Sequence, residues 1–360
     1  MAVSIKDIAR IAGVSHSTVS RALHGSTLIP ESTRSRIRKI AEELGYTASA
    51  IGRGLVKGRT EAIGVVVTSI ADPFNGEVVA GLEEAANQHG YSVILATSQG
   101  LPEREISVVR AFQSRRVDGI VVASSRVGST YADMLAELQI PVVLLNNQHP
   151  DDSTYSVSID NVQGAFEATN HLVSLGHERI AYLGDRLGLQ SDAERREGFR
   201  KAMDQAGLAV RPEFLLFGNG KMEGAAEAAH EFFEKRRGEA SAIFCYNDVS
   251  ALGVMEAAKR TGLQIPGDVS IVGFDDIQMA ALVTPSLTTV RQPKRQLGLR
   301  AMNVLIELLS GGPAERRLVM PGELIVRGST ERCETNLPGD GLGTRKLDDL
   351  VRNKTSVVDG

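Results

Sequence analysis

The stretch VSHSTVSRALHG, residues 14–25, follows Gly13 and is too polar for a helix buried on all sides. Ser15 is a good N-cap for a helix over residues 16–23, because its hydroxyl can accept from the first free backbone N–H groups. In that helix Val19, Ala22 and Leu23 share one apolar face. The opposite face then presents polar and charged groups to a partner, namely His16, Ser17, Ser20 and Arg21.

Two further helices are predicted around this stretch. Ser4 can cap a helix over residues 5–11, and Gly13 permits a sharp turn into the helix that follows. A third helix follows Pro30 and ends at Gly45. Two short helices joined by a tight turn and completed by a third form a helix-turn-helix, whose second helix enters the DNA major groove. Many such helical pairs are purely structural, so the pattern alone leaves both interpretations open.

The charge distribution separates this segment from the rest of the chain. Residues 1–60 hold ten Lys/Arg and four acids, a net charge of +6, whereas the other 300 of the 360 residues carry −10. A small basic module on an acidic body indicates that the module alone approaches a polyanion. A solvated, arginine-rich helix face is the alternative that charge leaves open.

The stretch IKDIARIAGVSHSTVSRALHG, residues 5–25, closely resembles the DNA-binding signature of the lac-repressor (LacI/GalR) family of bacterial transcription regulators. The resemblance implies that His16 and Ser17 set operator preference and that Arg21 contacts a base. His24 stands where the family usually has asparagine, and Ile29 stands where it usually has a serine before the proline. The DNA-binding residues that the resemblance implies are Ser4, Ser15, His16, Ser17, Thr18, Ser20, Arg21, His24, Thr33, Tyr46, Arg53 and Leu55.

Residues 47–60 are basic and glycine-rich, a composition typical of a flexible linker. The family resemblance implies a second role, a hinge helix that forms on DNA. Leu55 then occupies the position of a leucine that wedges into the minor groove at the operator centre, where such an insertion bends the duplex.

From residue 61 the pattern changes to apolar runs that alternate with helical stretches. Such alternation predicts βαβ units and parallel sheets buried on both faces. Two sets of these units predict two Rossmann-like lobes of the periplasmic-binding-protein type, beside the small all-α helix-turn-helix domain. The eight runs lie at residues 63–69, 91–98, 118–124, 141–147, 178–185, 213–218, 241–248 and 269–276.

The predicted domains follow from this pattern and from the family resemblance. Residues 1–46 form the helix-turn-helix domain, 47–60 the hinge, and 61–330 the bilobed body for effector binding and dimerisation. Residues 331–360 are charged with little periodicity and are predicted to be a mobile tail. Within the body, the N-lobe is expected over about 61–160 plus 290–320 and the C-lobe over about 161–289 plus 321–330.

Polar side chains follow the carboxyl ends of the predicted strands, where ligands bind in open α/β sheets. Singly each is as well explained as a helix cap or turn former, but together they indicate a ligand site. The resemblance implies effector contacts for Arg195, at the start of the helix containing AERREGF, and for Asp275. Asn219 stands where relatives often place an aromatic residue, which favours a sugar or sugar derivative over a purine. The candidate effector-binding residues are Asp72, Phe74, Asn146, Asp160, Arg195, Asn219, Asn247 and Asp275.

The sequence contains no nucleophile elbow, phosphate-binding loop or zinc-ligand spacing, so we expect no enzyme, no metal and no cofactor. No apolar run is long enough for a membrane span, and two cysteines without an export signal fit a reducing cytoplasm. We therefore expect a cytoplasmic, effector-controlled repressor, associated with the nucleoid when bound to DNA. Its expected partners are a palindromic double-stranded operator, a small carbohydrate and a second copy of the chain. A solute-binding protein without regulatory DNA binding is the alternative.

Overall fold

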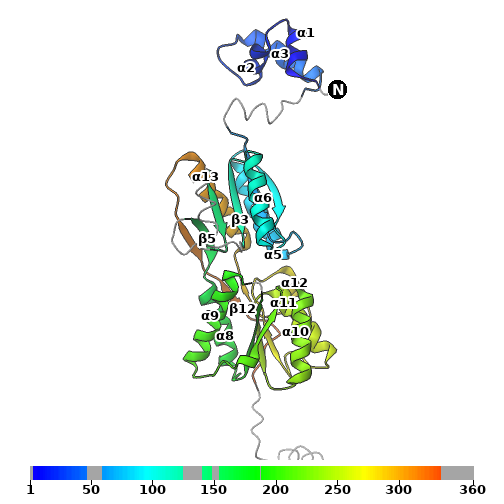
Figure 1. Ribbon diagram of the computed structural model, residues 1–360, viewed down its shortest axis with the longest axis vertical. Coiled ribbons are helices and arrows are strands. Elements are labelled where there is room, and N and C mark those ends of the chain that lie inside the picture. Colours follow the sequence, from blue (N-terminus) through cyan, green and yellow to red (C-terminus); the bar gives the residue numbers. More distant parts are fainter. Residues whose placement is uncertain (1–2, 47–58, 125–139, 148–153, 187, 334–360) are drawn as a thin grey trace, which may run out of the picture.

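The computed structural model describes residues 3–46, 59–124, 140–147, 154–186 and 188–333 (Figure 1). Its N-terminal part contains the three predicted helices, α1 (Ile5–Ala12), α2 (His16–Leu23) and α3 (Glu31–Glu43). Gly13 ends α1 with a φ of 64°, a conformation that glycine adopts without strain. Ile8, Val19 and Ile37, one from each helix, are completely buried against one another. The helix-turn-helix therefore has a small core of its own.

The N-lobe is built on a six-stranded parallel sheet in the order β11-β5-β4-β3-β1-β2. Helices α5 (Pro73–Gln88) and α13 (Lys294–Ser310) cover one face, and α6 (Pro102–Ser114) covers the other. The strands are β1 (Ala62–Val67), β2 (Ser92–Thr97), β3 (Gly119–Ala123), β4 (Val142–Leu145), β5 (Tyr155–Ile159) and β11 (Arg317–Met320).

The C-lobe contains a four-stranded parallel sheet in the order β7-β6-β8-β9. Its strands are β6 (Ile180–Asp185), β7 (Leu215–Gly218), β8 (Ala242–Cys245) and β9 (Ser270–Val272). Helices α8 (Asn161–Ser174) and α9 (Gln190–Gln205) cover one face. The other face is covered by α10 (Met222–Lys235), α11 (Asp248–Arg260) and the short α12 (Gln278–Leu282).

The chain passes between the lobes at three places (Figure 1). The first lies between β5 and α8, and the second between β10 (Thr289–Arg291) and α13. The third lies between β11 and β12 (Glu323–Ile325), which pairs antiparallel with β10. The three crossings lie close together in space. They form a shared boundary about which the two lobes can rotate as units.

Glycines bring the helices that cover each sheet into close contact. Gly81 of α5 faces α13 so closely that a Cβ atom there would overlap the carbonyl oxygen of Arg295. Gly298 of α13 faces α5 in the same way, against the carbonyl of Val78. Gly76, on the same helix as Gly81, has no atom within 4 Å of the position of an added Cβ. The helix pair therefore requires glycine at 81 and 298 but not at 76.

Gly81→Ala is expected to lower the free energy of unfolding by about 1–3 kcal/mol, because the methyl group must push α13 away from α5. Gly76→Ala is the matched control, and it should leave stability unchanged or raise it by up to about 1 kcal/mol. Thermal unfolding of the two variants measures the difference. Equal melting temperatures would contradict the close packing of α5 on α13.

The predicted tail boundary at residue 331 is too early by at least three residues. The backbone N–H of Cys333 donates to the carbonyl of Leu175 at 2.9 Å, and the imidazole Nε2 of His177 lies 3.1 Å from the carbonyl oxygen of Glu331. These contacts attach residues 331–333 to the C-lobe. Hydrogen bonds of this kind leave no periodic pattern in the sequence, so the boundary could not be placed from it. Residues 334–360 lie outside the described residues.

Candidate functional site

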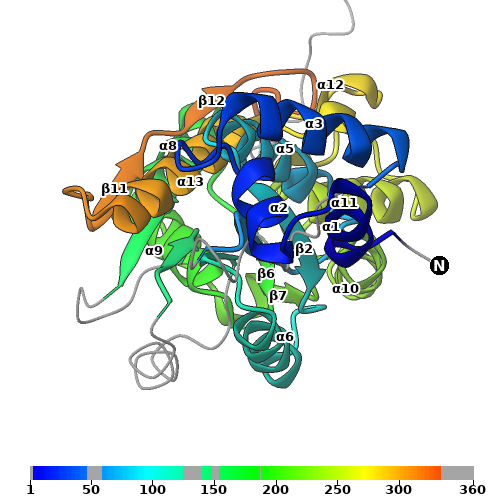
Figure 2. The same ribbon diagram turned by 90° about the horizontal axis from the view of Figure 1, so that it is seen from above.

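On the predicted outward face of α2, whose position in the helical module Figure 2 shows, His16, Ser17 and Arg21 are exposed and Ser20 is half-buried. Ser15 caps the helix by accepting from the N–H of Thr18 at 3.1 Å, and its hydroxyl also lies 2.8 Å from those of Ser17 and Thr18. The Arg21 side chain is exposed and has no hydrogen bond or ion pair with another described residue. The helix therefore offers an unpaired guanidinium and a group of hydroxyls to a partner.

The other predicted DNA-binding residues differ in accessibility. Ser4 is exposed and donates through its hydroxyl to Asp7 at 2.7 Å, whereas Thr33 and Tyr46 are half-buried beside the module core. His24 is exposed, but its Nδ1 lies 2.6 Å from the carbonyl oxygen of Ser20, so the ring folds back onto its own helix. Arg53 and Leu55 lie outside the described residues.

A cavity of about 700 Å³ lies between the two lobes of the body. It is lined by side chains that follow strand ends on both sheets, where the sequence predicted a ligand site. Seven of the eight predicted residues line it: Asp72, Phe74, Asn146, Arg195, Asn219, Asn247 and Asp275.

The eighth residue, Asp160, was wrongly placed in this site. Its carboxylate caps α8 by accepting from the N–H of Gln163 at 2.8 Å, and the side chain is exposed outside the cavity. An aspartate that follows a strand and precedes a helix has the same sequence context whether it caps or binds, so the pattern could not separate the two roles.

Arg195 lies in α9, which begins at Gln190 rather than at Arg195 as predicted. Its guanidinium donates to Asn161 Oδ1 at 2.9 Å and to the carbonyl oxygen of Tyr246 at 2.6 Å. The ring of Phe274 lies 3.8 Å from Arg195 Cζ and that of Tyr246 lies 4.8 Å away, so the planar group is held between two aromatic faces. Arg195 is consequently rigid as well as buried.

Asp275 faces this guanidinium at the cavity wall. Its Oδ1 lies 3.7 Å from Arg195 Nη1 and accepts from Gln292 Nε2 at 2.5 Å. Burial raises the pKa of Asp275 well above its usual value, and Arg195 opposes that rise. Asp275 also has a φ of 132°, which is uncommon for a residue with a Cβ and is maintained by its surroundings.

The N-lobe wall of the cavity is formed at the start of α5. Asp72 caps that helix through the N–H of Phe74 at 3.0 Å, and burial raises the pKa of the Asp72 carboxyl. Phe74 is buried and supplies an apolar surface to the cavity. Asn146 follows β4, and its Oδ1 is buried with no hydrogen-bond partner among the residues that the structure describes.

Several lining residues were not predicted from the sequence. Ser124 directly follows β3 and Gln99 lies two residues after the end of β2, so the strand-end argument could have found them. Gln292 lies at a crossing between the lobes, and no strand or helix pattern marks that position. The additional polar lining residues include Ser69, Gln99, Ser124, Ser191, Tyr246 and Gln292.

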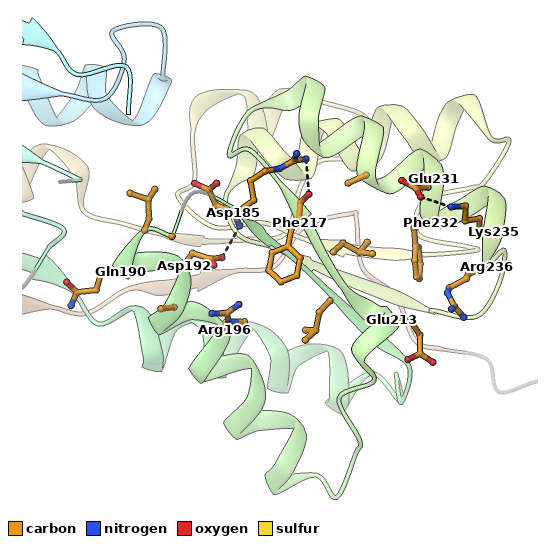
Figure 3. A pocket seen from close by; sticks show the side chains of 17 residues that line it. Asp185, Gln190, Asp192, Arg196, Glu213, Phe217, Glu231, Phe232, Lys235 and Arg236 are labelled. Carbon is orange, nitrogen blue, oxygen red and sulfur yellow. Dashed lines mark hydrogen bonds and ion pairs between the residues drawn. The ribbon is translucent and has the colours of Figure 1, made fainter. Parts of the chain in front are cut away.

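A second hollow, of about 850 Å³, lies within the C-lobe beside the edge strand β7 (Figure 3). It is larger than the cleft, but none of the eight predicted effector-binding residues lines it, and several of its charges are already paired with one another or with the backbone. Lys235 Nζ lies 2.6 Å from Glu231, and Arg186 donates to the carbonyls of Phe217 and Gly218. We therefore take the cavity between the lobes as the candidate ligand site.

Two family models match the chain. The model of periplasmic binding proteins and the sugar-binding domain of the LacI family covers residues 60–326, and that of bacterial regulatory proteins of the lacI family covers residues 4–49. None of the described helices has the length and apolar character that crossing a membrane requires.

Relatives and solved structures agree with these models. The repressor PurR of Photobacterium profundum is 34% identical over 330 residues, which cover 91% of this chain and 98% of that protein. The lac repressor dimer bound to operator and the anti-inducer ONPF has a TM-score of 0.81 and 26% identity. The match covers 92% of this chain and 100% of that chain. The CelR–cellobiose complex has a TM-score of 0.70 and 27% identity, covering 91% of this chain and 99% of that chain. The chain belongs to the LacI family, as a DNA-binding transcriptional repressor with an effector-binding domain and not as an enzyme.

Proposed function

We propose that the protein represses transcription as a homodimer on a two-fold symmetric operator and that a small, hydroxyl-rich effector in the cleft controls its affinity for DNA. The observation that carries the proposal is the cavity between the lobes, walled by rigid polar groups from both sheets. A ligand that contacts both walls has different affinities for different lobe arrangements, and linkage then makes DNA affinity depend on the ligand.

The cleft chemistry favours a sugar over a flat aromatic base. Phe74 offers one apolar face, while the Tyr246 ring is occupied by Arg195 and its hydroxyl lies 3.1 Å from Ser191. Asn219 lines the cavity where an aromatic residue would be expected for stacking. Cellobiose in the CelR complex shows that a related protein binds a sugar, whereas the PurR relatives make purine bases the competing effector class.

Exposed apolar side chains on both lobes support the proposal of a dimer. Ile70 and Leu95 in the N-lobe, and Met279 and Leu282 in the C-lobe, are between 40% and 71% exposed. Large apolar groups exposed on both lobes suit a subunit interface that covers them. A two-fold dimer then places one α2 helix on each operator half-site.

Selection of random DNA on the full-length protein, followed by anisotropy titration of the selected operator, tests the proposal. We expect a palindromic sequence, and we expect at least one compound from a panel of sugars and the bases hypoxanthine and guanine to change operator affinity. A purine as the strongest modulator would overturn the sugar assignment. A selected site without two-fold symmetry would overturn the dimeric operator complex.

Arg21→Ala is expected to weaken specific operator binding by about 1–3 kcal/mol, the usual value of a bidentate contact with a guanine edge. Binding to random DNA should change much less, and Arg38→Ala, on exposed α3, serves as a control for simple loss of charge. Anisotropy titrations on operator and random duplex at the same salt concentration measure both effects. If Arg21→Ala weakens both DNAs equally, Arg21 contacts only phosphate.

A further inference from the structure

The cleft has more carboxylates than cations. Asp72 lines it from the N-lobe, and Asp185, Glu223 and Asp275 line it from the C-lobe. The cations among the lining residues are Arg195 and Lys221, of which Lys221 is exposed. Glu223 is exposed like Lys221, so the buried and half-buried lining holds Asp72, Asp185 and Asp275 against the guanidinium of Arg195, and buried Lys294 contacts the backbone of Asp275 from behind the lining.

That guanidinium is partly occupied by contacts within the protein. Arg195 Nε donates to Asn161 Oδ1 and Nη1 to the carbonyl oxygen of Tyr246, Nη1 also faces the carboxylate of Asp275, and Cζ lies over the rings of Phe274 and Tyr246. It compensates Asp275 in part, but Asp72 on the opposite wall forms no ion pair with any described residue. A ligand in the cavity consequently meets at Asp72 a carboxyl group that has no ion-pair partner among the described residues.

The neutral groups of the cleft have the same bias toward accepting hydrogen bonds. Asn146 Oδ1 and Gln292 Oε1 have no hydrogen-bond partner within the described part of the chain. The two residues are only 7% and 2% exposed. Three of the lining amides already use an N–H group within the protein, because Asn75 donates to Ser69, Asn247 to Gly220 and Gln292 to Asp275. Buried acceptors without donors are satisfied by a ligand rich in O–H and N–H groups.

We propose that the effector is a positively charged, hydroxyl-rich molecule of the amino-sugar class, whose ammonium group faces Asp72 and Asp275 and whose hydroxyls donate to Asn146 and Gln292. The inference rests on the proposed function of the cleft and specifies its ligand. An ammonium group brings three donors and a compensating charge to the acidic walls, whereas a phosphate or carboxylate brings only acceptors and a repelled charge.

Without a bound cation, burial disfavours the ionised forms of the two carboxyls. Burial raises the pKa of both groups, and the charge of Asp72 contributes to the rise at Asp275. A bound cation would favour the ionised form of each group and reverse the repulsion between them.

Matched sugars test the proposal on the full-length protein. D-glucosamine, D-galactosamine and D-mannosamine are compared with their neutral parents, their N-acetyl derivatives, the parent 6-phosphates and hypoxanthine by thermal shift and calorimetry. We expect at least one amino sugar to bind about tenfold or more tighter than its parent and its N-acetyl derivative, as a charge-assisted hydrogen bond would provide. The proposal is overturned if none of the amino sugars binds, or if a neutral sugar, a phosphate or hypoxanthine binds more tightly than all of them.

Asp72→Asn separates charge from shape, because asparagine can still cap α5. We expect it to reduce the preference for the amino sugar over its parent to about threefold or less, since the ammonium loses one charged acceptor. Asp160→Asn, an equivalent change at an exposed cap outside the cavity, should keep the full preference. An unchanged preference in Asp72→Asn would contradict the assignment. If a neutral sugar alters operator affinity, the proposed function stands and only the charge assignment fails; if no compound does, effector control fails as well.

Discussion

Removal of residues 1–60 is expected to reduce operator affinity by about 10³-fold or more, to the level of non-specific binding, because specific complexes exceed non-specific ones by at least that factor. Helix α2, with the predicted recognition face, and the surplus of positive charge both lie in this segment. The remaining body is acidic and repels the DNA backbone. Anisotropy titration of operator and random duplex, at one salt concentration, measures the loss for the truncated chain.

The truncated body should remain folded, which makes the loss interpretable. The apolar cores of the two lobes are formed by residues from Ile63 onward, and the core of the helical module is formed by residues 3–46 alone. Thermal unfolding and binding of the cleft ligand should therefore be retained. Specific retention of operator by the truncated body would contradict the assignment of DNA binding to the helical module.

The fold was largely predictable because its determinants are local. The caps at Ser4 and Ser15 and the turn at Gly13 define helices from a few neighbouring residues. The apolar strands of the body are equally legible, because parallel strands buried on both faces are apolar throughout. The start of helix α9 was harder to predict, because its first turn contains Gln190 and Asp192 and has no apolar stripe. The start was therefore placed five residues too late.

The candidate ligand site was only partly predictable, because it depends on how two lobes meet. Asp72 and Asp160 have the same local pattern, a carboxylate between a strand and a helix, yet only Asp72 faces the other lobe across a cavity. Gln292 bonds Asp275 from a crossing segment, a contact that no local periodicity encodes. The pairing of charges and the unpartnered acceptors, which determine ligand chemistry, also follow only from the assembled lobes.

Asp275→Asn is expected to weaken effector binding by about 30-fold or more, the effect of removing one charge from a buried, hydrogen-bonded charged site. Operator affinity without effector should change by less than about threefold, because sites separated by more than 10 Å with no shared partners are nearly independent. Asparagine is preferable to alanine here, because an alanine would leave Arg195 without the oxygen that it faces and would add a cavity. Operator titrations with increasing concentrations of the compound selected in the panel measure both affinities.

The two classes of outcome locate the role of Asp275. If Asp275 binds the effector, the response of operator affinity should reappear at about 30-fold higher effector concentration and reach the same maximum, because linkage fixes the maximum by the two end states. If Asp275 instead holds the lobes in one arrangement through Gln292 and Arg195, the maximum itself should fall and operator affinity without effector should change. Because Asp276→Asn perturbs the neighbouring ion pairs with Arg291 and Arg327 but lies outside the cavity lining, it reports the effect of loosening this segment alone. A normal effector response in Asp275→Asn would remove this carboxylate from the site.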